Sequence, residues 1–481
     1  MSLFTELFII LLIVNTLGAI FTVLRSVRDI ATTWAWLLVL IFLPGVGFVI
    51  YLFVGRRLSA KKMRLIQAEY AKASAAFVHL QKAANAKGRL VPTTTKAGQE
   101  LINLFLNLAR APLLHNGDVK LFYDGQAKFA ALFADIEAAQ SEILVEYYTI
   151  YPDALGTQLR DLLIKKAQQG VTVRVVYDAW GSMGAGAKWW RPLIQAGGWA
   201  ESYFSSKHLI ADFRMNYRLH RKIVIIDDQI GYIGGFNVGD QYVSRSPKFG
   251  FWRDTHLRIV GNTVMALKIQ FIMDYNATVS DGRQLPYPSR PLADAPLPTS
   301  GAMQIVACGP ESAGQQIKFG YVKLISGATK SVWLQTPYLI PDDTVYDALM
   351  NAALSGIDVR VMIPDMPDHP FIFRATQYYA TALTKVGVKV YHYQNGFLHA
   401  KTMVVDGHLA SVGSANLDIR SFKLNFEANA FIYDDALAQQ LQQAFIEDQK
   451  HSRLLTVEAI QAQSHWLRFK QQFSRLLSPI L

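Results

Sequence analysis

The hydrophobic positions of the chain fall into two patterns, one continuous and one periodic. Near the N-terminus, residues 7–24 and 30–55 form two uncharged runs, of 18 and 26 residues. About 20 apolar residues in a helix cross the core of a bilayer, so these runs predict two transmembrane helices, at about residues 4–24 and 31–55. The alternatives are a signal peptide or a buried pair of helices. The first run has no basic start and no small-residue cleavage site, and a second span follows at once.

Charges beside the two runs predict how this hairpin is oriented. Five basic residues follow the second run: Arg56, Arg57, Lys61, Lys62 and Arg64. The short loop between the runs carries only Arg25 and Arg28. Basic residues favour the cytoplasmic side of a membrane, and a hairpin returns the chain to the side where it began. We therefore expect the bulk of the chain to face the cytoplasm from a multi-pass membrane anchor.

The rest of the chain alternates apolar strands with helical stretches, and the alternation occurs twice. In the first copy, strands at residues 142–148 and 171–177 flank a helical stretch that ends in glycine. In the second copy, strands at 331–335 and 357–363 do the same. Strand, helix and strand in this order are typical of a βαβ unit with parallel strands. The predicted fold class is therefore α/β, with two duplicated lobes.

Composition divides the chain further. Residues 284–300 contain five prolines, which is typical of a linker. The predicted segments are the membrane hairpin at 1–60, a helical connector at 61–110, a first lobe at 111–284, the Pro-rich linker at 285–300 and a second lobe at 301–481. Each lobe contains a late Phe-x-x-Asp tag, Phe271/Asp274 and Phe445/Asp448. The second lobe ends in an amphipathic helix near residues 462–477, whose apolar side either lies on a membrane or, as is more common, packs on its own domain.

One motif carries the candidate chemistry. Five positions recur at a constant offset of 179 residues, as His220-x-Lys222-x4-Asp227-x6-Gly234-x2-Asn237 and His399-x-Lys401-x4-Asp406-x6-Gly413-x2-Asn416. A single His-x-Lys is uninformative, whereas five fixed positions repeated inside a duplicated chain are not a coincidence. The candidate catalytic residues are therefore His220, Lys222, Asp227, His399, Lys401 and Asp406.

The residue types in this motif favour a phosphodiester substrate. Each His-x-Lys opens an apolar strand, where side chains two apart share a face. The aspartates, Asp227 and Asp406, are expected on the opposite face in a structural role, while Asn237 and Asn416 return toward the reactive face and bind phosphate. Paired lysines neutralise an anion, and paired imidazoles supply a nucleophile and a general acid. A lysine beside each histidine opposes a metal ion, so we expect no metal and no cofactor.

The doubled H-x-K-x4-D motif resembles that of the phospholipase D superfamily. Its flanks are similar to those of bacterial cardiolipin synthases: Asn216-x-Arg218-x-His220, Gly239-Asp240-x-Tyr242, Trp252-Arg-Asp254, Asp418-x-Arg420-Ser-Phe422 and Leu424-Asn-Phe-Glu427. The resemblance covers nearly the whole chain. It implies two α/β/α lobes that share one active site, at a bacterial cell membrane.

The resemblance also implies a reaction and roles for further residues. Two phosphatidylglycerols would give cardiolipin and glycerol through a phosphohistidine, with His220 as the nucleophile and His399 as the general acid. Asp254 and Glu427 would each orient the histidine of the other lobe. Near-twofold symmetry leaves the opposite assignment of the histidines open, and the sequence does not set the oligomeric state or the acyl-chain preference.

Other functions are compatible with parts of this sequence. A hydrolytic phospholipase D, or a related transferase with another lipid acceptor, would use the same motif. Nucleases share it too, but the membrane hairpin and the lack of base-stacking aromatics on a basic strand argue against nucleic acid. A non-enzymatic membrane scaffold usually accompanies a degraded motif, and here both copies are whole.

The distribution of charge along the chain indicates which partner to expect. The net charge is +11, of which residues 1–64 contribute +5 (7 basic, 2 acidic) and residues 65–481 contribute +6 (41 basic, 35 acidic). The catalytic body is thus only mildly basic, and the excess charge flanks the membrane hairpin. Cys308 is the only cysteine, which excludes a disulfide scaffold. Phosphatidylglycerol and cardiolipin in an anionic membrane are the expected partners.

Overall fold

The computed structural model describes residues 95–203, 216–279, 282–288, 301–310 and 314–478, together with 30–43, 45–51 and positions 6, 14, 16–18, 21, 55 and 68. The chain forms two compact units. One comprises Met1–Arg64 with Ser206–Tyr217, and the other comprises Leu65–Ser205 with Arg218–Leu481. The second unit contains the predicted second lobe and the predicted first lobe apart from Ser206–Tyr217.

Among the described residues of the N-terminal unit, two short helices have defined bounds, α2 (Ile30–Phe42) and α3 (Val46–Ile50). Within the described residues, neither these nor any other helix has the length and apolar content needed to cross a membrane. The single helix predicted at 31–55 is divided, because Gly45 adopts φ 78°, a left-handed conformation that ends a right-handed helix. Trp36 and Tyr51 pack edge to face across the break, with ring centroids 5.1 Å apart. Most of the helix predicted at 4–24 lies outside the described residues.

The first lobe is built on one mixed sheet with strand order β1-β7-β6-β5-β2-β3-β4. Its strands are β1 (Asn116–Asp124), β2 (Glu142–Tyr147), β3 (Thr172–Asp178), β4 (Trp199–Tyr203), β5 (Lys222–Ile226), β6 (Ile230–Gly234) and β7 (Trp252–Gly261). Its helices are α6 (Gly125–Ala138), α7 (Ala154–Gln168), α8 (Ala187–Gln195) and α9 (Thr263–Thr278), with a short 3-10 turn η2 (Asp240–Val243). The parallel pairing of β2 with β3 confirms the βαβ unit expected from residues 142–177.

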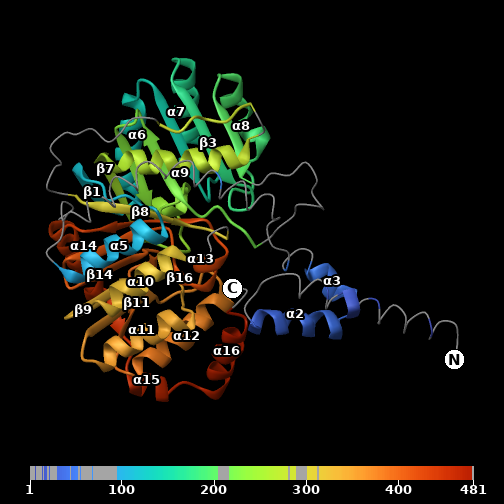
Figure 1. Ribbon diagram of the computed structural model, residues 1–481, viewed down its shortest axis with the longest axis vertical. Helices are drawn as coiled ribbons and strands as arrows, with labels where there is room; N and C mark the ends of the chain where they lie inside the picture. The colour runs from blue at the N-terminus through green and yellow to red at the C-terminus, as the bar shows by residue number, and fades with distance from the viewer. Residues whose placement is uncertain are drawn as a thin grey trace. The chain divides into compact units, whose positions relative to one another are not determined.

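The second lobe repeats this arrangement, with strand order β18-β12-β11-β9-β14-β15-β17-β8. Its strands are β8 (Met303–Cys308), β9 (Ser331–Gln335), β11 (Asp358–Pro364), β12 (Lys389–Tyr393), β14 (Thr402–Val405), β15 (Leu409–Gly413), β17 (Glu427–Ile432) and β18 (Ser452–Leu454), and β10 (Leu339–Ile340) pairs separately with β16 (Leu417–Asp418). Its helices are α10 (Gln316–Ser326), α11 (Asp343–Leu354), α12 (Pro370–Thr384), α13 (Ile419–Lys423), α14 (Asp435–Lys450), α15 (Val457–Gln461) and α16 (His465–Leu476). The lobes thus have matching strand orders, with β18 added at one edge, and Figure 1 shows helices against each sheet.

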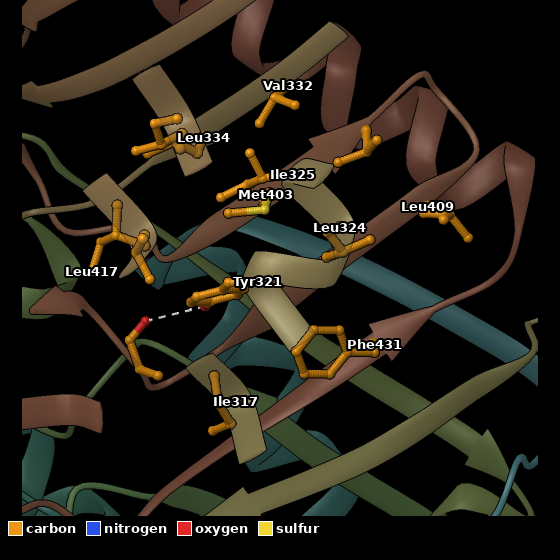
Figure 2. Packing of buried hydrophobic residues seen from close by; sticks show 14 of the residues in the cluster. Ile317, Tyr321, Leu324, Ile325, Val332, Leu334, Met403, Leu409, Leu417 and Phe431 are labelled. Carbon is orange, nitrogen blue, oxygen red and sulfur yellow. Dashed lines mark hydrogen bonds between the residues drawn. The ribbon is translucent and has the colours of Figure 1, made fainter. Parts of the chain in front are cut away.

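One helix from before the first lobe belongs to the core of the second. Helix α5 (Lys96–Leu108) places Leu101, Ile102 and Phe105 in the hydrophobic cluster that α10 and the second sheet form. Phe105 lies against Phe431, with ring centroids 4.4 Å apart. Figure 2 shows the centre of this cluster, where Tyr321 lies among apolar side chains from several strands, and its hydroxyl donates to the carbonyl of Ala415 at 3.4 Å. The core of the second lobe therefore includes a helix that precedes the first lobe in the sequence.

Candidate active site

Both motif histidines lie immediately before the central strand of their lobe, and each is held by the backbone of the other lobe. The amide of His220 donates to the carbonyl of Phe426 at 2.9 Å, and that of His399 donates to the carbonyl of Arg253 at 2.7 Å. The short strand β13 (Phe397–Leu398) also pairs with β7 of the first lobe. Both histidines are buried. The two lobes therefore meet where the histidines are.

Each imidazole is paired with a buried carboxylate from the opposite lobe. His220 Nδ1 lies 2.9 Å from Glu427 Oε2, and His399 Nδ1 lies 2.6 Å from Asp254 Oδ2. Both carboxylates are fully buried. Burial alone would raise the pKa of each, but the charges of the facing histidine and lysine outweigh it and hold each pKa below its ordinary range. The geometry is the cross-lobe pairing that the resemblance implies.

This pairing sets which nitrogen of each ring is available for chemistry. An ionised carboxylate only accepts, so Nδ1 carries the hydrogen that faces it. Nε2 is then the free atom of each neutral imidazole. Two hydroxyls, those of Ser414 and Ser421, also donate to the Glu427 carboxylate, at 2.5 Å and 2.9 Å. These bonds fix Glu427 and through it the ring of His220.

The two lysines concentrate positive charge in the same space. Each ammonium donates to the carbonyl of its own motif histidine, Lys222 to His220 at 2.5 Å and Lys401 to His399. Burial lowers the pKa of Lys222 to about 7 and that of Lys401 to about 8. The charge of Lys401 acts on Lys222 and on His220, so the two pairs form one electrostatic site. Such a site favours an anion.

The histidines themselves are poor bases in this environment. Burial lowers the pKa of His220, and it lowers that of His399 to about 4, with the lysine charges acting in the same direction. Both rings are therefore neutral near pH 7 before substrate binds. A bound phosphodiester would oppose the lysine charges and raise both histidine pKa values.

The two asparagines are buried, and each follows the strand after its histidine. Asn237 Oδ1 accepts from the amide of Thr149 at 3.2 Å, and its amide nitrogen lies 3.4 Å from the hydroxyl of Tyr242. Asn416 interacts through its side chain with Asp418. The preceding motif glycines allow close packing: a Cβ on Gly234 would lie 2.5 Å from His256 Cα, and one on Gly413 would lie 2.2 Å from the side chain of Asn429.

The structure does not bring the motif aspartates to the histidines. Asp227 lies just past β5 and accepts from the amides of Gln140, Ser141 and Glu142 at 2.7–2.9 Å. Asp406 holds the start of β9 in the same way, through three amides at 2.8 Å. Both aspartates join the end of the motif strand to the start of its neighbour, at the end remote from the histidines.

Sequence reasoning did not indicate that Tyr148 lies in the site, and it assigned no role to Trp252 beyond its place in the motif flank. The Tyr148 ring lies 4.9 Å from that of His220 and 5.4 Å from Lys222 Nζ, while the Trp252 ring lies 5.1 Å from that of His399. Tyr148 directly follows β2, at the carboxyl end of a parallel strand, where α/β sheets place their ligands. The position of Tyr148 at this end of the strand could have indicated from the sequence that it lies in the site. The described residues contain no group of three or more histidine, cysteine or acidic side chains arranged to hold a metal ion.

Comparison with known proteins defines the class. The family model described as "Cardiolipin synthase, PLD-like domain" matches residues 132–248 and 321–449. The model described as "Phospholipase_D-nuclease N-terminal" matches residues 8–56. The chain belongs to the cardiolipin synthase family of PLD-like proteins.

Similar full-length relatives support this assignment. The chain is 47% identical to a cardiolipin synthase of Listeria innocua serovar 6a over 487 residues, which cover 100% of both chains. It is 46% identical to one of Staphylococcus aureus, covering 99% of this chain and 97% of the relative. The crystal structure of phosphatidylserine synthase from Haemophilus influenzae has the same fold, with a TM-score of 0.62, 15% identity and coverage of 79% of this chain and 100% of that one.

Proposed function

We propose that the protein is a cardiolipin synthase, a phosphatidyltransferase that converts two phosphatidylglycerols into cardiolipin and glycerol. The observation that carries the proposal is the meeting of two His–Lys pairs in one buried, cationic site, with each imidazole bound to a carboxylate of the other lobe. Identity of 46–47% over essentially the whole chain to cardiolipin synthases supports the same reaction.

The first step forms a phosphohistidine. Nε2 of His220 attacks the phosphorus of one phosphatidylglycerol, the bond from phosphorus to the departing glycerol oxygen breaks, and His399 gives its proton to that oxygen. In the second step His399 takes the proton of a primary hydroxyl on another phosphatidylglycerol. That oxygen attacks phosphorus and the bond to His220 breaks. One diester replaces another, so no nucleotide, metal or cofactor is required.

The charged residues of the site prepare this exchange. Lys222 and Lys401, with Asn237 and Asn416, hold the non-bridging oxygens of the phosphate. His399 has a pKa of about 4 before substrate binds, so its proton is acquired together with the anionic lipid. Asp254 and Glu427 orient the rings and stabilise each imidazolium as it forms. Asp227 and Asp406 support the motif strands without touching the reacting atoms.

The N-terminal segment would keep the reaction at the membrane. We infer a hairpin of two spans at about 4–24 and 31–55, with the lobes at 111–284 and 301–481 facing the cytoplasm. The match of residues 8–56 to an N-terminal family model and the basic residues after position 55 support this arrangement. An enzyme held at the bilayer meets a high local concentration of acceptor lipid, which favours transfer over capture of the intermediate by water.

A product assay tests the proposal. The purified full-length protein is incubated with headgroup-labelled phosphatidylglycerol vesicles and no nucleotide. The expected products are cardiolipin and an equal amount of labelled glycerol. Phosphatidic acid as the sole lipid product would establish a hydrolytic phospholipase D instead, and a mixed lipid formed on addition of another alcohol-bearing lipid would establish a related transferase.

Variants of the histidines and their carboxylates separate the roles. His220→Ala and His399→Ala should each reduce turnover by about 10³-fold or more. Rapid quenching with labelled lipid should place the phosphate on His220; phosphate on His399 would reverse the two roles. Asp254→Asn should allow a phosphohistidine to form slowly on His220, because Asp254 serves His399, whereas Glu427→Gln should suppress its formation.

A further inference from the structure

The C-terminal helix α16 turns its apolar side away from the protein. Its buried residues are polar, Gln471 and Ser474. Its large apolar residues are exposed, by 64% at Trp466, 54% at Phe469, 48% at Phe473 and 71% at Leu476. A helix that stabilised its own lobe by hydrophobic packing would show the reverse.

Helical geometry places these two sets on opposite sides. The exposed residues follow the spacing i, i+3, i+7 and i+10, which is one face at about 100° per residue. Helix α16 packs against α12, as Figure 1 shows at the edge of the second lobe, and Gln471 and Ser474 lie on its buried side. Ser464 caps the helix, and Arg468 donates to the carbonyl of Gln461 at 2.7 Å. These bonds hold the start of the helix, and farther along the Arg475 guanidinium lies 5.1 Å from the ring centroid of Tyr378 on α12.

The exposed aromatic rings form one continuous strip. Trp466 and Phe469 stack with ring centroids 5.4 Å apart and planes 12° apart. Phe469 and Phe473 stack with centroids 6.3 Å apart. Contiguous apolar surface of this kind usually marks a contact with a partner or a membrane.

Positive charge borders this strip. The helix carries Arg468, Lys470 and Arg475 and no acidic residue. Lys470 Nζ lies 5.8 Å from the centroid of the Trp466 ring, so a cation sits directly beside the apolar strip. With 12 residues, or about 18 Å, the helix is too short to span a bilayer. Aromatic residues bordered by cations on a short helix are typical of helices that lie in the membrane interface.

We propose that α16 docks the second lobe on the surface of an anionic bilayer, with Trp466, Phe469, Phe473 and Leu476 inserted among the lipids. A second copy of the chain fits this surface less well, because a twofold contact would bring the same cations together. The docking helix would orient the active site toward lipid-embedded substrate, and in this respect it rests on the proposed function. It is a second membrane contact, distinct from the proposed N-terminal hairpin.

Depth-dependent quenching tests the contact without reference to catalysis. Cys308 is replaced by alanine, and Leu476→Cys in the full-length protein carries an environment-sensitive fluorophore. The matched control is Leu354→Cys, at the end of α11, which is 68% exposed where Leu476 is 71% exposed. In phosphatidylglycerol vesicles with a quencher on the upper acyl chain, the label at Leu476 should be quenched at least threefold more than the label at Leu354. Equal quenching at the two positions would overturn the proposal.

Activity on two forms of substrate gives the second readout. The triple variant Trp466→Ser, Phe469→Ser, Phe473→Ser should lose about tenfold or more of its rate on vesicles with dilute phosphatidylglycerol, a loss equivalent to about 1.4 kcal/mol. Its rate on detergent-dispersed phosphatidylglycerol should stay within about twofold of the wild type, and Gln472→Ser should change neither rate.

An equal loss on both substrates, or a change from dimer to monomer in the triple variant, would overturn membrane docking. A wild-type protein that makes no cardiolipin would refute the proposed function, while the quenching result would still decide the docking.

Discussion

Burial of two lysines beside two histidines makes the charge of the site depend on pH within the physiological range. The ammonium of Lys222, with a pKa near 7, and that of Lys401, with a pKa near 8, are both partly discharged under ordinary conditions. In the proposed mechanism both act as cations that hold an anionic phosphate. Buried carboxylates of Glu427 and Asp254 oppose the discharge, and burial promotes it.

The first prediction concerns this pH dependence. Because kcat/KM reports groups of the free enzyme, it should fall as pH rises above about 7 to 8, where the lysines lose their protons. Lys222→Arg keeps its charge at all accessible pH values. The variant should be less active at neutral pH, since a guanidinium is larger, but its alkaline decline should begin about one pH unit higher. An unshifted alkaline limb in Lys222→Arg would assign that decline to another group.

At the scale of elements, the motif aspartates act on strand ends. Asp227 and Asp406 sit at positive φ, 51° and 55°, and each accepts three backbone amides at the start of the adjacent strand. These amides would otherwise lack partners where β2 and β9 begin. The contacts fix the pairing of the motif strand with its neighbour, and this pairing determines where the histidine at the other end of the strand is held.

The second prediction separates this support from catalysis. Asp227→Asn should lower the free energy of unfolding by about 1–2 kcal/mol at pH 7, because a neutral amide accepts fewer and weaker bonds. The kcat of the folded protein should stay within a few-fold of the wild type. The pKa of Asp227 is lowered in the folded state, so its stabilisation is present above the unfolded pKa of about 4 and disappears as pH falls through the folded pKa. Thermal unfolding measured from pH 7 down to pH 3 should show the two proteins converging.

Asp228→Asn is the matched control for this measurement. It occupies the same turn at φ 59°, but its carboxylate makes only a partly exposed ion pair with Lys268 at 2.7 Å. Exposed pairs contribute less than about 1 kcal/mol. A loss of kcat in Asp227→Asn without loss of stability would show instead that the aspartate takes part in the reaction.

Some of these elements could be predicted from sequence and others could not, for identifiable reasons. The paired strands beginning at Glu142 and Ser331 were predictable, because buried parallel strands leave continuous apolar runs. The motif histidines were predictable because duplication made their spacing visible. The role of α5 was not, since the amphipathic pattern of residues 96–108 shows that the helix packs but not against which lobe. The orientation of α16 was not either, because its two faces depend on the surface that α12 offers.

At the scale of the whole molecule, the two lobes are joined by exchanged backbone pairing. Leu219 bridges to Phe426, and β13 pairs with β7, so each histidine is registered against the strand that carries its carboxylate. A shift of one lobe against the other would break both His–carboxylate pairs at once. The contacts that hold the two lobes together are therefore the same contacts that position the motif histidines.

A buried ion pair at this junction adds to the same coupling. Arg253 of the first lobe donates through Nε to Asp448 of the second, at 2.9 Å, and both side chains are buried. Asp448 belongs to the Phe-x-x-Asp tag of the second lobe and also accepts from Gln335 at 2.7 Å. Arg253 directly precedes Asp254, the partner of His399, so its contact with Asp448 fixes the backbone that carries that carboxylate.

The third prediction follows from breaking this pair. Asp448→Ala leaves the Arg253 guanidinium buried without its carboxylate, which should reduce stability by about 3–5 kcal/mol. Because the pair joins the lobes, we expect the lobes of the wild type to unfold in one calorimetric transition and those of the variant in a broader or divided one. Turnover should fall with the displacement of Asp254. Arg253→Met with Asp448→Leu should recover most of the stability, since no charge is then buried.

Asp135→Ala is the control within one lobe, because Asp135 pairs with Arg258 at 2.7 Å inside the first lobe. Asp135→Ala should lower stability while the two lobes still unfold together. If Asp135→Ala and Asp448→Ala had the same effect on cooperativity, the lobes would be coupled by something other than the Arg253–Asp448 pair.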